Sequence, residues 1–183
     1  YKSPTLVGTP VTFMAAAVLS EEDKDVDDAN TDIDEGANGY SASLAYDQNG
    51  VYLAAGYDNN IQSKTDSAWR LAGSVDMGKI NMVPGLTLGA LYQETDVADK
   101  SDDEKSWLVS GKYKIGATPW AVKAQYIDTS NQSGVKDRDA TEVALGAEYT
   151  INKATKGHLY AAQIDTDNVS DKTIVGGGLE YKF

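Results

Sequence analysis

The feature that most constrains the fold is a hydrophobic period of two that recurs along the chain. Within the segment 141–151 the odd positions from Val143 onward are apolar, as at Leu145, while the even positions are polar or small, as at Glu148. Residues 173–183 divide in the same way, with Val175 and Leu179 on their apolar side. Successive side chains of a β-strand point to opposite faces, so each such segment is predicted to be a strand with one apolar and one wet face.

Segments of this kind follow one another through the whole chain, and no stretch has a convincing helical period with caps. A parallel sheet covered by helices would need continuous apolar runs instead. The pattern predicts an all-β fold in a single domain over residues 1–183, with residues 1–3 forming the end of one further strand. The expected strands are 11–19, 40–47, 51–58, 68–77, 85–94, 106–115, 120–128, 141–151, 157–165 and 173–183.

The connections between these strands alternate between long, polar segments and shorter turns. The long ones are 20–39, 59–67, 95–105, 129–140 and 166–172, and the short ones are 4–10, 48–50, 78–84, 116–119 and 152–156. In an up-and-down meander, alternate connections lie at the same end of the sheet. Sorting by length onto opposite ends is typical of outer-membrane barrels, whose short turns face the periplasm. The sequence therefore predicts a transmembrane antiparallel up-and-down β-barrel, with about ten or eleven strands in this chain.

Composition agrees with this prediction. Hydrophobic residues make up 41% of the chain and the mean hydropathy is −0.42, and no apolar run approaches the roughly 18–20 residues of a transmembrane helix. Barrels have this composition because only alternate residues face lipid. The net charge of −12 disfavours nucleic acid as a partner. Cysteine is absent and His158 is the single histidine, so we expect no metal site, no cofactor and no enzymatic activity.

The aromatic residues on the expected outward face gather at the two ends of the strands. Such belts are typical of membrane–water interfaces, where amphipathic rings prefer to lie. Next to the long connections are Tyr40, Tyr57, Trp69, Tyr92, Trp107 and Tyr126, and nearer the short turns are Phe13, Tyr46, Tyr113, Trp120, Tyr149, Tyr181 and Phe183.

The two ends of the chain resemble those of a known family. The opening Tyr1-Lys2-Ser3-Pro4, followed by Gly8 and an apolar strand, is similar to the strand and turn after the pore-constricting third loop of Gram-negative general diffusion porins. The close Gly178-Leu179-Glu180-Tyr181-Lys182-Phe183 resembles the last strand of that family. Because such porins usually have sixteen strands, the chain looks like their C-terminal two-thirds. The alternative is a complete barrel that closes with its own ten strands.

The resemblance implies a passive channel in the bacterial outer membrane for ions and small hydrophilic solutes. It also implies a set of partners, namely outer-membrane lipid and lipopolysaccharide, two further copies in a homotrimer, and the barrel assembly machinery. In that family the C-terminal aromatic is read as an assembly signal, which corresponds here to Phe183 with Tyr181 and Leu179. The acidic motif of the constricting loop has no counterpart in this sequence.

Polar side chains with inward parity are the candidates for lining the pore. Mixed charges and amides of this kind indicate a hydrated wall, although a salt bridge to a neighbouring strand explains any single charge equally well. The candidates are Lys2, Asp47, Asp58, Arg70, Asp76, Gln93, Lys112, Lys114, Lys123, Gln125, Glu142, Glu148, Gln163, Glu180 and Lys182. Outward parity is assigned to His158, and Gly176-Gly177-Gly178 is expected to let the wall bend or to leave space inside.

Two long connections are strongly acidic. Residues 20–39 carry nine acidic side chains against Lys24 alone, and residues 95–105 carry five more. Their field is expected to give the pore a mild cation preference, and divalent cations could bridge the carboxylates to lipopolysaccharide. The alternative function is an outer-membrane adhesin or receptor barrel whose acidic surface loops carry the function. A small barrel enzyme is a third class, which the missing catalytic set disfavours.

Overall fold

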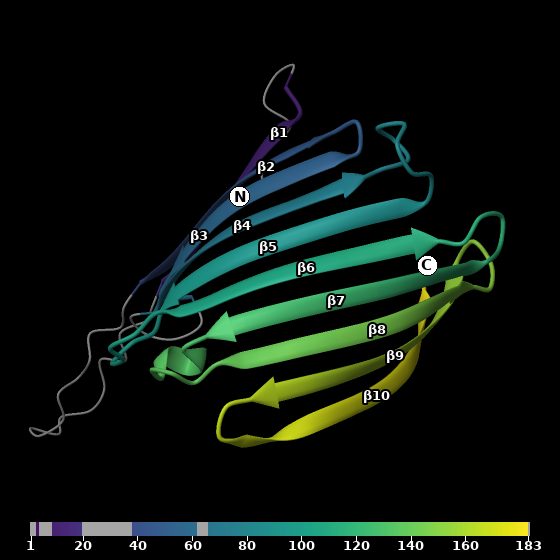
Figure 1. Cartoon of the computed structure of the whole chain (residues 1–183). Helices are drawn as coiled ribbons and strands as arrows, with labels where there is room; N and C mark the ends of the chain where they lie inside the picture. Colours follow the sequence, from purple (N-terminus) through teal and green to yellow (C-terminus); the bar gives the residue numbers. More distant parts are fainter. Residues whose placement is uncertain (1–2, 4–8, 20–37, 62–65, 183) are drawn as a thin grey trace, which may run out of the picture.

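The computed structural model describes residues 3, 9–19, 38–61 and 66–182, and it confirms the all-β prediction (Figure 1). The strands form one antiparallel ten-stranded sheet in which each strand pairs with its sequence neighbours. Its strands are β1 (Val11–Val18), β2 (Gly39–Gln48), β3 (Val51–Asn59), β4 (Ser67–Asp76), β5 (Leu86–Asp96), β6 (Glu104–Lys114), β7 (Trp120–Ser130), β8 (Ala140–Thr150), β9 (Thr155–Thr166) and β10 (Val169–Tyr181).

The short 3-10 helix η1 (Gln132–Gly134) interrupts the connection between β7 and β8. In the part of the chain that the structure describes, no helix has the length and apolar character needed to cross a membrane.

The strand bounds lie within a few residues of the sequence-based ones, but two connections differ from expectation. The segment 166–172 was expected to be a long connection; instead β9 and β10 are joined directly through Asp167 and Asn168, with Asn168 at φ 59°. An irregularity between Val169 and Lys172 takes up the remaining residues. The expected short turn 78–84 belongs to a longer connection that folds on itself, because the Asp76 carboxylate accepts the backbone N–H groups of Gly78 and Lys79.

The turn between β2 and β3 is the one whose geometry its sequence explains most directly. Asn49 and Gly50 occupy it alone, with φ angles of 53° and 84°. A two-residue turn with both central residues at positive φ matches the right-handed twist of the flanking strands, and Asn-Gly is the preferred pair for it. This turn fixes the register Gln48↔Val51 and thereby decides which residues of the two strands share a face.

The register divides the sheet into two faces that differ in chemistry. The apolar face, defined by the cross-strand set Leu71, Leu88, Val109, Leu145 and Leu159 with their same-parity neighbours, is widely exposed, with Leu145 61% exposed. The polar face is defined as the opposite one, which carries Arg70, Lys112 and Glu148. The predicted alternation is thus present in three dimensions.

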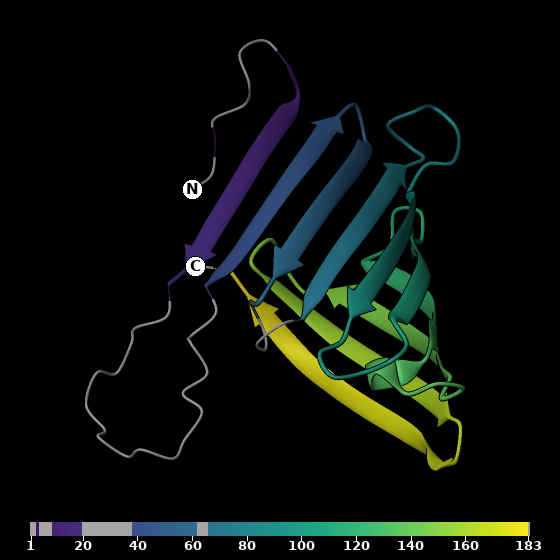
Figure 2. The ribbon, with the colours of Figure 1, turned by 90° about the vertical axis from the view of Figure 1, so that its left-hand side faces the viewer.

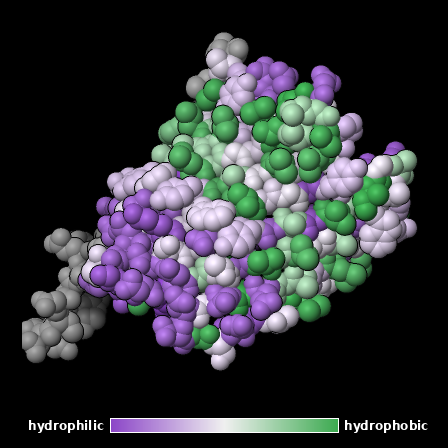
Figure 3. All heavy atoms as spheres, viewed as in Figure 1, coloured by the Kyte–Doolittle hydropathy of each residue, from purple (hydrophilic) through white to green (hydrophobic). Residues whose placement is uncertain are grey.

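The sheet is one curved layer without a conventional hydrophobic core (Figure 2). Among the described residues, the buried hydrophobic side chains are the alanines Ala68, Ala121 and Ala140. Hydrophobic residues spread over the middle of the surface in Figure 3, and hydrophilic residues gather at the end where the long connections lie. An apolar surface of this extent needs a non-aqueous environment or a partner to cover it.

The two outer strands of the described sheet, β1 and β10, do not pair with each other. Before β1, however, the Ser3 N–H donates to the Phe13 carbonyl at 2.8 Å, and the Phe13 N–H donates to Ser3 Oγ at 2.9 Å. These bonds join Ser3 to the backbone of β1, which agrees with the expectation that this residue belongs to one further strand.

The Tyr160 side chain explains why position 176, in the run Gly176-Gly177-Gly178 of β10, is a glycine. Gly176 lies directly opposite Tyr160 on the polar face, and a Cβ at Gly176 would overlap the tyrosine ring. Gly178, two residues along the same face, has open space at the same place. Of the two roles expected for the glycines, leaving space inside is the one that this contact supports at Gly176.

The two faces predict opposite tolerance to a charge. Leu71→Arg should lower the free energy of unfolding by about 2–4 kcal/mol, because it places a charge at mid-height on the apolar face, whereas Ala72→Arg on the polar face should cost much less. Urea unfolding in lipid vesicles measures both. The pair Leu145 and Gly146 is less clean, because a Cβ at Gly146 would lie 3.3 Å from the Leu159 carbonyl oxygen. Equal losses at Leu71 and Ala72 would contradict the assignment of faces.

The glycine run gives a second prediction. Gly176→Ala should destabilise the barrel by about 1 kcal/mol, because the added methyl group displaces the end of the half-exposed Tyr160 side chain. Gly178→Ala, with nothing within 4 Å of the new Cβ, is the matched control and should be nearly neutral. Adding Tyr160→Ala to Gly176→Ala should recover part of the loss, and a double variant no more stable than Gly176→Ala would rule out the ring contact as its cause.

Candidate functional site

Most of the residues expected to line a pore lie together on the polar face. Lys2 lies outside the described residues, and Lys182 follows β10 directly, with its Nζ 3.6 Å from a carboxylate oxygen of Glu180. The remaining candidates that the ladders place on this face are Asp47, Asp58, Arg70, Asp76, Gln93, Lys112, Lys114, Lys123, Gln125, Glu142, Glu148 and Glu180.

The predicted parity of β9 is wrong. The register pairs Gln163 with Val143, which puts Gln163 on the apolar face, and it pairs His158 with Glu148, which puts His158 on the polar face. Both faces of β9 mix apolar and polar residues, for example Leu159 beside Tyr160. Alternation within this strand therefore cannot fix its phase, and pairing with β8 decides it.

One ionic cluster lies on β3, β4 and β5, toward the end with the long connections. Arg70 Nη1 donates to the Asp58 carboxylate at 2.8 Å, and its Nε donates to the Gln93 side chain. Gln93 in turn donates to Thr95 Oγ1 at 3.0 Å. The guanidinium is thereby held by groups from both neighbouring strands.

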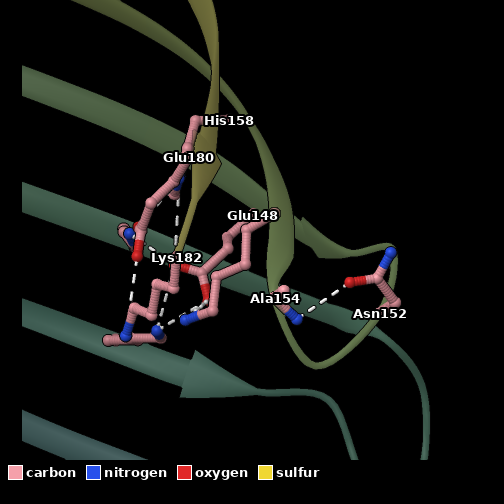
Figure 4. A network of polar contacts seen from close by, with 9 residues as sticks. Glu148, Asn152, Ala154, His158, Glu180 and Lys182 are labelled. Atoms are coloured by element: carbon pink, nitrogen blue, oxygen red, sulfur yellow. Dashed lines mark hydrogen bonds and ion pairs between the residues drawn. The ribbon is translucent and has the colours of Figure 1, made fainter.

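A larger cluster, here called the Glu148 cluster, joins β6 to β9 near the short turns. Glu148 accepts Lys112 Nζ at 2.9 and 3.1 Å, Lys123 Nζ at 2.8 Å and Lys156 Nζ at 3.2 Å. His158 Nδ1 lies 3.9 Å from Glu148, and its Nε2 lies 3.5 Å from Glu180. Figure 4 shows Glu148, His158, Glu180 and Lys182 gathered at this end of the wall.

The reach of the Glu148 cluster shows which way the wall curves. Lys112 on β6 bonds Glu148 on β8 across the intervening strand β7. Side chains two strands apart converge in this way on the concave side of a sheet. The Glu148 side chain is 7% exposed, whereas those of Lys112, Lys123 and Lys156 are 39%, 41% and 32% exposed. The carboxylate thus lies against the wall and the ammonium groups lie toward the open side.

The polar face is not uniformly polar. Ala54, Ala72, Leu91, Leu108 and Ile127 are direct cross-strand partners in succession. This apolar row lies between the Arg70 and Glu148 clusters, and alternation alone did not predict it. It divides the wetted wall into two separate charged regions.

Two side chains of the Glu148 cluster were not predicted from the sequence, and one predicted pore-lining residue joins neither cluster. Lys156 falls just before the expected strand 157–165, and His158 was assigned the other face, so both members of the Glu148 cluster were missed. No signal within this strand gave its face, because its start at Thr155 and its phase are set by pairing with β8. Asp76 is turned into the connection after β4 instead of joining a cluster.

At the opposite end, the described connections are bonded to one another. Ala98 N–H donates to the Asp66 carboxylate at 2.6 Å, and Ser133 N–H donates to the Glu104 carboxylate at 2.7 Å. Asp167 N–H donates to the carbonyl of Asp139 at 2.9 Å. These bonds link neighbouring connections from β3 to β10. The acidic segment 20–37 lies outside the described residues.

The expected aromatic belts find support in ring contacts on the apolar face. Tyr40 with Tyr57, Trp69 with Tyr92 and Trp107 with Tyr126 have ring centroids 6.0, 5.1 and 5.1 Å apart, all near the long connections. Trp120 and Tyr149, 4.7 Å apart, form a pair at the other end. Leu179 and Tyr181 of the proposed assembly signal are exposed on the same face, and Phe183 lies outside the described residues.

Comparison with known proteins agrees with this geometry. The family model described as Gram-negative porin matches residues 1–169. A loop-deletion mutant of OmpT, an outer membrane protein of Vibrio cholerae, superposes with a TM-score of 0.66 at 18% identity, over 99% of this chain and 61% of that one. The anion-selective porin from Comamonas acidovorans gives 0.67 at 18% identity, over 100% and 54%. No curated protein sequence matches the chain.

The fold and its two opposed faces define a wall of the porin class of β-barrels. The chain belongs to the Gram-negative porin family, and its location is the bacterial outer membrane. It spans less than two thirds of the length of these two solved structures. At these identities, the structural matches establish the fold alone.

The Glu148 cluster makes a testable contribution to stability. Lys112 and Lys123 are direct cross-strand partners, and like charges in that position repel. Glu148→Gln should therefore lower the free energy of unfolding by about 1–3 kcal/mol, because three ammonium groups lose their shared counter-charge. Urea unfolding in lipid vesicles at low salt gives the value. Glu142→Gln is the control, since the described part of the chain offers Glu142 no ion pair; losses of the same size in both variants would contradict the assigned role.

Proposed function

We propose that this chain forms the wall of a passive, water-filled channel for ions and small hydrophilic solutes. The observation that carries the proposal is the contrast between the faces: exposed leucines on one, and the Arg70 and Glu148 clusters on the other. Charged groups exposed to the extent of Lys112 and Lys123 need water beside them. Membership of the porin family supports the same conclusion.

The proposed channel needs more strands than these ten. The absence of pairing between β1 and β10, and the greater length of the matched porin structures, support a wider barrel in which the described sheet is one part. A wider barrel encloses water where a small one is filled by side chains. The chain is proposed to have no catalytic step, because it belongs to a family of porins and its sequence has a single histidine and no cysteine.

The proposed assembly follows from the family. We infer a homotrimer in contact with outer-membrane lipid and lipopolysaccharide, delivered by the barrel assembly machinery. The exposed positions of Leu179 and Tyr181 on the apolar face, just before Phe183, support a role for this end in assembly. Carboxylates of the long connections are the groups that would bind divalent cations shared with lipopolysaccharide.

A mild preference for cations is the finer part of the proposal. The end with the long connections carries an excess of acidic residues, which makes the local potential negative and concentrates cations there. Described members of this rim are Asp66, Asp96, Asp99, Asp102, Asp103, Glu104, Asp137, Asp139, Asp165, Asp167 and Asp171. The segment 20–39 adds nine acidic residues in sequence.

Reversal potentials across planar bilayers test this function. In a KCl gradient the folded protein, in a barrel closed by the further strands proposed above, should pass K⁺ in modest preference to Cl⁻. Replacing Asp23, Asp25, Asp27 and Asp28 by Asn should reduce the preference without closing the pore. In molar salt, where the Debye length falls to about 3 Å, the two proteins should converge.

The same measurement separates the alternatives. Properly folded protein that does not conduct would contradict the channel and favour the adhesin or receptor barrel. Conduction with a preference for Cl⁻ would contradict only the proposed role of the acidic rim. The quadruple variant must keep its β-sheet circular dichroism and heat-modifiable migration for the comparison to count.

A further inference from the structure

The Glu148 cluster brings together more positive than negative charge on the open side of the wall. Lys112 and Lys123 face each other across β6 and β7, and Lys156 approaches from β9, so three ammonium groups share one carboxylate. The acid next along this end, Glu180, is engaged by His158 and Lys182. The three lysines thus keep a net positive charge at this point.

Among the described residues, Glu148 is the one acid that forms ion pairs with these three lysines. Asp76 lies in the same cross-strand row as Lys112, two strands away, but its carboxylate accepts the backbone N–H groups of Gly78 and Lys79. On β6, Lys114 adds a further positive charge closer to the short turn. The end of the polar face near the short turns is therefore basic over β6, β7 and β9, in contrast to the acidic rim.

The arrangement leaves donors available and holds them in place. Each ammonium group has three N–H donors, of which Lys112 directs two toward Glu148 oxygens and Lys123 and Lys156 one each. Glu148 lies nearly buried beneath the partly exposed lysine side chains. The carboxylate holds three long side chains in one geometry. These side chains therefore lose less conformational entropy when a ligand binds.

We propose that Lys112, Lys123 and Lys156 form a binding subsite for a polyvalent oxyanion, specifically the phosphate group of a free solute. A phosphate presents several acceptor oxygens to the three ammonium groups at once and forms charge-assisted bonds with them. A single chloride ion has no such set of oxygens. The subsite lies on the face opposite the aromatic belts, which separates it from the lipid headgroups. It deepens the proposed function by naming a class of solute that the wall retains.

Calorimetric titration of the folded protein in detergent with inorganic pyrophosphate tests the subsite without requiring conduction. Lys123→Gln should weaken binding by about tenfold through the loss of one charge-assisted contact. Lys172→Gln is the matched control, because it removes the same charge from the same face at the other end, on β10, and it should leave the affinity unchanged. Circular dichroism confirms that both variants are folded.

Each outcome decides a separate point. Equal affinities for the wild type and Lys123→Gln, or no pyrophosphate binding by folded wild type, would overturn the subsite. Displacement of pyrophosphate by a short-chain phosphatidylglycerol would reassign the site to a lipid headgroup and overturn the free-solute proposal. In bilayers, pyrophosphate should reduce the K⁺ current of the wild type and of Lys172→Gln at about tenfold lower concentration than that of Lys123→Gln. Binding without any conductance would reject the proposed channel and leave the subsite standing.

Discussion

The structure depends on the hydrogen-bonded pairing of backbone groups between adjacent strands, in a layer that has almost no packed interior. With Ala68, Ala121 and Ala140 as the buried hydrophobic residues of the described chain, side-chain burial cannot be the main source of stability. In hydrocarbon an unpaired N–H or C=O costs several kcal/mol, so a continuous ladder is the arrangement that remains. The same hydrocarbon medium covers the exposed leucines of the apolar face, so their exposure from the sheet does not destabilise the fold.

The charged clusters follow from this arrangement. A single-layer sheet offers its second face no packing partner, so that face must be wetted or internally neutralised. Arg70 is neutralised by Asp58 on the strand beside it, whereas Glu148 gathers lysines from three strands. The Arg70 cluster balances its charge locally, and the Glu148 cluster leaves an excess. This difference makes the second cluster the better candidate for an interaction with solutes.

Sequence reasoning could predict what repeats along one strand and could not predict what depends on several. Alternation within 141–151 placed Leu145 and Glu148 on opposite faces correctly, and Asn49-Gly50 located a turn through its backbone preference. The Glu148 cluster requires the registers of β6 to β9 together, and no single segment encodes them. At β9 even the face was mistaken, since Tyr160 and Leu159 give both sides apolar residues.

Because each strand of the described sheet pairs only with its sequence neighbours, this sheet is modular along the chain. Removing or duplicating one complete hairpin would leave every other ladder with its original partners and would return the next strand in its original direction. The inside and outside of the wall would keep their chemistry. The insertion or deletion of one residue within a strand is not tolerated in this way. It moves every later side chain of that strand, up to the next turn, to the opposite face. Barrel circumference is thus easier to alter in this architecture than the phase of any one of its strands.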